Sequence, residues 1–201
     1  MLLYGRKDMK KTFLLLIAVC FFCGCGDKSS QMTIQGELTA NRDFSGEVIY
    51  LLSIGSRGDF SVKKDSAIIE EGRFTIQQKT DTAYIALLRT KNPVQSYFLQ
   101  PLLIVVEPGT LEVKLDSASY ANGTPLNNTL QAWKERKASF DLAARHLRQH
   151  TQLTQHREEY YNYNYNFVKE NKDNPAGQFV YKMTKSLFTE EQKEELAIPD
   201  E

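Results

Sequence analysis

The hydrophobic pattern of this chain changes its period once, and this change constrains the fold more than any other feature. From Met32 to about Asp116, apolar and polar residues alternate in short runs that Gly, Asn, Asp and Pro separate. Alternation with period two is typical of strands. After Asp116 the apolar residues recur at every third or fourth position, which is the spacing of a helix face. The sequence therefore predicts a β-rich unit followed by a helical segment.

Seven strands are expected in the first part of the chain. They lie at residues 32–40, 47–54, 61–70, 73–78, 83–89, 102–106 and 111–115. Gly72 and the segment Glu107-Pro108-Gly109-Thr110 supply the Gly and Pro that tight turns between strands favour. Because no helical pattern interrupts these runs, we expect an antiparallel sandwich or small barrel, and the antiparallel β-sandwich is the fold class that we predict.

Helical periodicity is expected to begin at Pro125, with Thr124 as the capping residue. The apolar stripe of this helix consists of Leu126, Leu130, Trp133, Phe140, Ala144 and Leu147. Such a stripe has to be covered, either by the sandwich and the following helices or by another molecule, and we favour the intramolecular arrangement. Further helices are expected at about residues 153–171, from Pro175 onwards, and after a capping box at residues 189–192.

The first 24 residues are predicted to be an export signal rather than part of the fold. Basic residues precede an apolar run of 11 residues from Phe13 to Cys23, whereas about 20 apolar residues are needed to span a membrane. Gly24-Cys25, which a polar stretch follows, resembles the lipobox of bacterial lipoproteins, so Cys25 is the predicted lipidation site. The alternative is a plain secretory signal that is cut near Gly24 or Gly26 and leaves a soluble protein.

These patterns divide the chain into four parts. A lipoprotein signal peptide occupies residues 1–24, a polar tether 25–31, a β-sandwich domain 32–120, and a helical segment packed on it 121–201. The whole chain has 25 Lys and Arg against 25 Asp and Glu. Residues 1–24 hold four of the basic residues and one of the acidic ones, so the remainder carries a net charge of −3. Nucleic-acid binding is therefore disfavoured.

All three cysteines lie between residues 20 and 25. Cys20 and Cys23 have the CxxC spacing of thioredoxin-like redox sites, but they lie in the apolar segment that processing would remove. The remainder has neither a disulfide framework nor a cysteine zinc site. It also lacks a G-x-S-x-G, an H-E-x-x-H and a phosphate-binding loop motif. We therefore expect no enzymatic activity, no catalytic residue, no metal and no other cofactor.

Two further groups of side chains have the composition of binding sites. His146 and His150 are four residues apart, but no third ligand completes a metal site, and a solvated helix face is the preferred interpretation. The flat rings of an aromatic cluster could stack on the rings of a glycan; its members are Tyr160, Tyr161, Tyr163, Tyr165 and Phe167. Because helical geometry spreads them over more than one face, we expect some of these rings to pack inside the protein.

Several segments resemble a known family when they are taken in their order along the chain. They are Thr33-Ile34-Gln35-Gly36-Glu37-Leu38, Asp65-Ser66-Ala67 with Gly72-Arg73-Phe74, Val106-Glu107-Pro108-Gly109, Gly123-Thr124-Pro125-Leu126-Asn127, and Glu170-Asn171-Lys172-Asp173-Asn174-Pro175-Ala176-Gly177. Together they are similar to domain of unknown function 4369, the N-terminal accessory domain of many lipid-anchored thiol-disulfide oxidoreductases of Bacteroides-type gut bacteria. In those relatives a linker leads from the helices to a thioredoxin-like module with a catalytic CxxC. Here the chain ends where that linker would begin, so the resemblance implies the accessory domain without the enzyme.

The sequence as a whole favours a lipoprotein of the cell envelope, anchored through Cys25 to a membrane, with the outer membrane as the expected one. Its expected role is that of a non-enzymatic binding or interaction domain. The alternative is a truncated or split accessory subunit of a thiol-disulfide oxidoreductase that acts with a separate thioredoxin-like protein. The partners considered besides the membrane are such a protein or a glycan, and no nucleic acid is expected.

Overall fold

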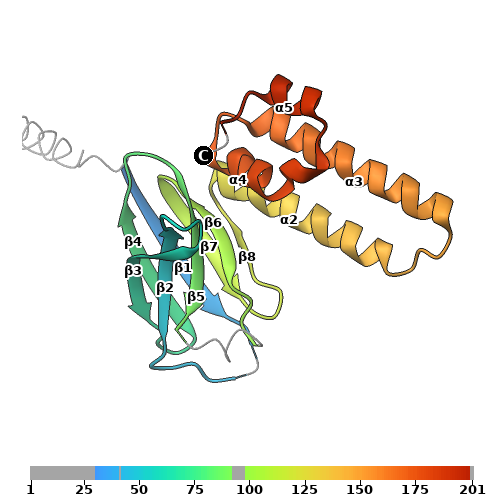
Figure 1. Cartoon of the computed structure of the whole chain (residues 1–201). Helices are drawn as coiled ribbons and strands as arrows, with labels where there is room; N and C mark the ends of the chain where they lie inside the picture. Colours follow the sequence, from blue (N-terminus) through green and yellow to red (C-terminus); the bar gives the residue numbers. More distant parts are fainter. Residues whose placement is uncertain (1–29, 41, 92–97, 200–201) are drawn as a thin grey trace, which may run out of the picture.

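A computed structural model describes residues 30–40, 42–91 and 98–199 (Figure 1). The predicted signal peptide, with Cys20 and Cys23, lies outside the described residues. So do Cys25 and most of the predicted tether. Within the described part, no helix has both the length and the apolar character that crossing a membrane requires.

The described strands form two four-stranded sheets that pack face to face. Sheet A has the order β4-β1-β7-β8 and contains β4 (Arg73–Lys79), β1 (Gln31–Leu38), β7 (Gly109–Leu115) and β8 (Tyr120–Asn122). Sheet B has the order β3-β2-β5-β6 and contains β3 (Phe60–Ile68), β2 (Val48–Ile54), β5 (Tyr84–Thr90) and β6 (Leu102–Val106). The predicted β-sandwich is confirmed.

Two features of the sandwich differ from the expectation. The central pair of sheet A, β1 and β7, is parallel, with Met32 opposite Gly109 and Leu38 opposite Leu115, while the other pairs are antiparallel. The strand β8 was not predicted. It has only three residues, which is too short for alternation to be visible in the sequence.

The core of the sandwich consists of alternate residues from both sheets. Met32 and Ile34 of β1, Ile49 and Leu51 of β2, and Ile104 of β6 are fully buried between the layers. Gly36 lies opposite Phe74 in the register of β1 and β4. A β-carbon on Gly36 would lie 2.0 Å from the Phe74 ring, so glycine is what allows this ring to lie over β1.

Four α-helices follow the strands and lie together at one side of the sandwich (Figure 1). They are α2 (Pro125–Ala144), α3 (His150–Asn171), α4 (Pro175–Thr184) and α5 (Glu190–Leu196), and a short 3-10 helix, η3 (Lys185–Leu187), precedes α5. The predicted capping box at the start of α5 is present, with Gln192 N–H donating to the Thr189 hydroxyl. The start of α3 lies three residues earlier than expected.

The apolar stripe of α2 is covered within the molecule at its centre. Trp133 is 5% exposed, and its Nε1 donates to Oδ1 of the fully buried Asn164 on α3 at 3.0 Å. The Trp133 ring also packs against Phe167, with 6.2 Å between ring centroids. Further along α2, Phe140 packs edge-on against Tyr160. These contacts join α2 and α3 into an antiparallel hairpin.

The start of α2 is held by side chains of other elements. Thr124 occupies the capping position as expected, but its side chain makes no capping hydrogen bond to the helix backbone. Instead Oε1 of Glu107 accepts hydrogen bonds from the backbone N–H groups of Leu126 at 2.8 Å and Asn127 at 3.2 Å. The carboxylate thus satisfies two donors that a helix N-terminus leaves without an intrahelical partner.

Helix α2 also covers the β6 edge of sheet B. β6 is an edge strand, and exposed edges attract further strands. The side-chain amide of Asn127 accepts from Val105 N–H at 2.9 Å and donates to Val105 C=O at 2.7 Å, as a neighbouring strand would. Lys134, two turns further along α2, donates to Leu103 C=O at 3.1 Å. We call Asn127 and Lys134 the edge clamp.

Candidate binding surfaces

A groove of about 640 Å³ lies between the sandwich and the helices. It is bordered by β6, by the segment that leads into β8, by α2 and by α4. Apolar side chains supply much of its wall, among them Leu103, Ala138, Phe179 and Met183. Met183 is 62% exposed, so the α4 side of the groove presents apolar surface to solvent.

Lys134 lines this groove and is held by the edge strand. Burial lowers the pKa of Lys134 to about 8, although the neighbouring Glu135 acts in the opposite direction. Among the described residues, no carboxylate forms an ion pair with Lys134. A cation in apolar surroundings without an anionic partner is unfavourable. The groove therefore contains an ammonium group that a negatively charged ligand would stabilise.

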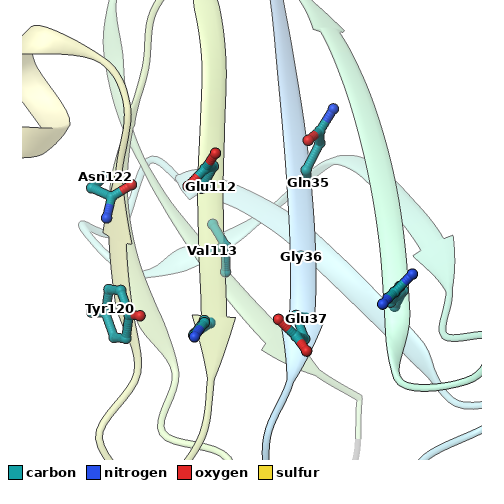
Figure 2. A pocket seen from close by; sticks show the side chains of 9 residues that line it. Gln35, Gly36, Glu37, Glu112, Val113, Tyr120 and Asn122 are labelled. Atoms are coloured by element: carbon teal, nitrogen blue, oxygen red, sulfur yellow. The ribbon is translucent and has the colours of Figure 1, made fainter.

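A second hollow, of about 350 Å³, lies on the outer face of sheet A (Figure 2). Its exposed side chains form two rows across the strands, because residues of alternate positions face outward. One row contains Asn122, Glu112 and Gln35, and the other contains Tyr120, Lys114, Glu37 and Arg73. Figure 2 shows Asn122, Glu112 and Gln35 standing side by side on three neighbouring strands. The outer face of sheet A is therefore hollowed and polar.

Comparison with protein families places this sandwich in a known group. The model of the family described as Domain of unknown function (DUF4369) matches residues 32–130. The chain contains a DUF4369 domain. Comparison with the curated proteins and with the solved structures gives no significant match. The family's description names no activity.

The matched segment covers the eight strands of the DUF4369 domain and the first turns of α2. It includes Glu107 and Asn127, which hold the helix start on the sandwich. Lys134 and the α4 residues of the groove lie beyond residue 130. The groove is therefore built jointly by the DUF4369 domain and by the helices that follow it.

The aromatic cluster predicted from the sequence does not form one platform. Tyr163 packs against Phe140 on α2, Phe167 packs against Trp133, and the hydroxyl of Tyr165 donates to Glu195 on α5. Tyr160 and Tyr161 do lie together, and they border a hollow of about 380 Å³ between α2 and α3. Most of these rings thus stabilise the packing of the helices.

The remaining expectations concern metals. Within residues 30–40, 42–91 and 98–199, no group of three or more His, Cys, Asp or Glu side chains could hold a metal ion. His146 and His150 are both exposed.

Two features of the groove and the sheet face were missed in the sequence, although signals for them exist. Asn127 and Lys134 are seven residues apart, so they lie on one helix face as polar residues beside an apolar stripe. Gln35, Glu37 and Glu112 occupy the outward positions of predicted strands. The sequence does not say which strands are neighbours, so it could not bring these side chains together.

Proposed function

We propose that this chain is a lipid-anchored protein of the cell envelope that binds a ligand without catalysing a reaction. The observation that carries the proposal is the groove between the DUF4369 domain and the helices, with Lys134 in its wall. A concave site with apolar walls and one titratable group of perturbed pKa is a typical ligand site, and the polar side chains of this groove include Glu135 and Asp141 beside Lys134. The described residues around Lys134 include no nucleophile and base in hydrogen-bond contact.

The ligand proposed for the groove has an apolar body and a carboxylate. Leu103, Ala138 and Met183 would contact the apolar part, because these side chains form the walls. The carboxylate would pair with Lys134, which donates one hydrogen bond to Leu103 C=O and keeps further N–H donors. Pairing would favour the ammonium form and return the pKa of Lys134 toward its ordinary value.

Intrinsic fluorescence provides a direct test, because Trp133 is the chain's only tryptophan and lines the groove. Residues 26–201 would be titrated at pH 7 with octanoate and with octanol, which differ in the carboxylate. Octanoate is expected to change the emission of Trp133 saturably and to bind at least tenfold more tightly than octanol. Its affinity is expected to fall above pH 8, where Lys134 loses its proton.

Two lysines of α2 give the matched comparison. Lys134→Met is expected to weaken octanoate binding at least tenfold, since a charged partner contributes about 1.5 to 3 kcal/mol. Lys137→Met is expected to weaken binding less than Lys134→Met does, because Lys137, which also borders the groove, already forms an ion pair with Asp141 at 2.6 Å. Equal binding of octanol and octanoate, or an equal effect of both variants, would contradict a carboxylate site.

The lipid anchor is proposed at Cys25, on the resemblance of Gly24-Cys25 to a lipobox. Mass spectrometry of the mature N-terminus is expected to find an acylated Cys25, and Cys25→Ser should release the protein from membranes. An unmodified N-terminus at any residue after Cys25 would contradict the anchor and leave the groove proposal untouched.

The second candidate is an accessory subunit that acts with a separate thioredoxin-like protein, and it rests on the family resemblance. Residues 26–201 alone are expected not to reduce insulin disulfides, because the only CxxC lies at Cys20 and Cys23. Dithiol-dependent turnover by this chain would refute a non-enzymatic role. A rise in the activity of an added thioredoxin-like protein would favour the accessory role over a small-molecule ligand.

A further inference from the structure

The outer face of sheet A carries a set of polar side chains that the fold does not use. Gln35, Glu37, Glu112 and Asn122 are exposed, and within the part of the chain that the structure describes none of their side chains makes a hydrogen bond or an ion pair. They border one hollow of about 350 Å³ (Figure 2).

The charges in this hollow balance. Arg73 and Lys114 oppose Glu37 and Glu112, and the register places Glu37 directly opposite Arg73 on one side and Lys114 on the other. A binding site for an anion or a cation would instead be dominated by one sign of charge. The hollow therefore offers donors and acceptors in similar measure and no net charge.

A ligand that matches such a surface must donate and accept hydrogen bonds at closely spaced positions. Carboxylates accept, guanidinium and ammonium groups donate, and the amides of Gln35 and Asn122 do both. Hydroxyl groups have the same dual character, and a sugar presents several of them on one ring. The chemistry of the hollow thus matches a neutral, polyhydroxylated molecule.

The shape of the surface is consistent with more than one sugar ring. Neighbouring strands lie about 4.8 Å apart, so a row of side chains on four strands spans about 14 Å. Tyr120 stands at the β8 end of one row, where its ring packs on the Lys114 ammonium at 5.9 Å from the ring centroid. An aromatic ring at the end of a polar row can stack on the apolar face of a sugar.

We infer that the outer face of sheet A binds a neutral oligosaccharide across β8, β7, β1 and β4. Glu112 and Gln35 would contact its hydroxyl groups at the centre, and Tyr120 would cover one terminal ring. This site is separate from the carboxylate site proposed in the groove, although Tyr120 borders both hollows. Glu112 and Gln35 border only the sheet hollow, so they provide the cleaner test.

The test uses residues 26–201 labelled with nitrogen-15 and titrated with neutral tetrasaccharides of glucose, mannose and N-acetylglucosamine, followed by amide chemical shifts. At least one of them is expected to shift the amides of Gln35, Glu112 and Asn122 saturably, without changing the emission of Trp133. Glu112→Ala and Gln35→Ala are each expected to weaken that binding at least fivefold. Gln77→Ala, on the same face but outside the hollow, should leave it within twofold.

Other outcomes overturn the inference. They are the absence of saturable shifts with all three tetrasaccharides, shifts confined to Leu103, Lys134 and Phe179 in the groove, and equal weakening by Gln77→Ala and Glu112→Ala. Because the groove is tested by octanoate and Trp133 emission, failure of the sheet site leaves that proposal standing, and failure of the groove leaves the sheet site standing.

Discussion

Replacing Asn127 by Ala tests whether the edge clamp holds the helices on the sandwich. Asn127 is 2% exposed, and its amide satisfies both the N–H and the C=O of Val105, which is itself fully buried. The same amide donates to the Thr124 hydroxyl at 2.8 Å. Alanine removes these hydrogen bonds, together with the longer one from Asn127 Nδ2 to Glu107 Oε1 at 3.5 Å, and leaves the N–H and C=O of Val105 without a partner in the protein.

The expected loss follows from the groups that are left behind. A buried backbone group without a hydrogen-bond partner costs about 1 to 3 kcal/mol, and two such groups remain on Val105. Alanine favours the helix by about 0.5 kcal/mol over asparagine, which offsets a small part of the loss. The free energy of unfolding is therefore expected to fall by about 2 to 5 kcal/mol. Urea denaturation followed by Trp133 emission measures this change.

Asn128 provides the control at the next position. Its Oδ1 accepts from Gly123 N–H at 3.0 Å in an exposed position, so Asn128→Ala is expected to cost less than about 1 kcal/mol. Hydrogen exchange gives an independent readout, because the Val105 amide should lose its protection in Asn127→Ala alone. The edge clamp is refuted if Asn127→Ala lowers the free energy of unfolding by less than about 0.5 kcal/mol, which is the range of ordinary surface substitutions. It is also refuted if Asn128→Ala is equally destabilising.

Two further predictions concern α2. Trp133→Phe removes the donor to the buried Asn164 and is expected to lower the free energy of unfolding by about 1 to 3 kcal/mol. Trp133→Ala should lower it by about 3 to 5 kcal/mol, and calorimetry measures both changes. An unchanged unfolding temperature of Trp133→Ala with a changed oligomeric state would show instead that the apolar stripe binds another molecule. Burial lowers the pKa of Lys134 from 10.5 to about 8, so the unfolded chain binds more protons between these values and stability is expected to rise with pH there. Allowing for partial exposure, the rise from pH 8 to 9.5 is about 1 to 2 kcal/mol. Urea denaturation of Lys134→Met should lack this increment, and an identical pH profile in both chains would contradict the shift.

The elements that the sequence predicts well are those whose signals are local. Strand β1 alternates because one of its faces, with Met32 and Ile34, meets the other sheet, so period two marks both the strand and its inward face. The start of α4 is similarly local, since the Asn174 side chain accepts from the N–H groups of Ala176 and Gly177 within the same turn. The two residues of such an interaction lie close together in the sequence, so the pattern that they form can be recognised there.

The features that the sequence does not predict depend on partners far apart in the chain. Met32 of β1 lies beside Gly109 of β7 in the parallel pair, and no local pattern encodes which strand another one joins. The same limit hides the sheet hollow, because Gln35 and Glu112 meet only through that pairing. The sequence predicts Glu107 only as part of a turn, yet its carboxylate caps α2, which begins nearly 20 residues later.

The edge clamp explains why the sandwich and the helices belong to one structural unit. An uncovered β6 would present its polar backbone groups to other chains, and in this fold two side chains of α2 occupy them. Asn127 lies inside the DUF4369 match, while Lys134 lies beyond it. The first contact is therefore a property of the matched domain, and the second is added by the rest of α2. Lys134 both covers the β6 edge and borders the groove. The same residue therefore joins α2 to the sandwich and, as we propose, selects the ligand.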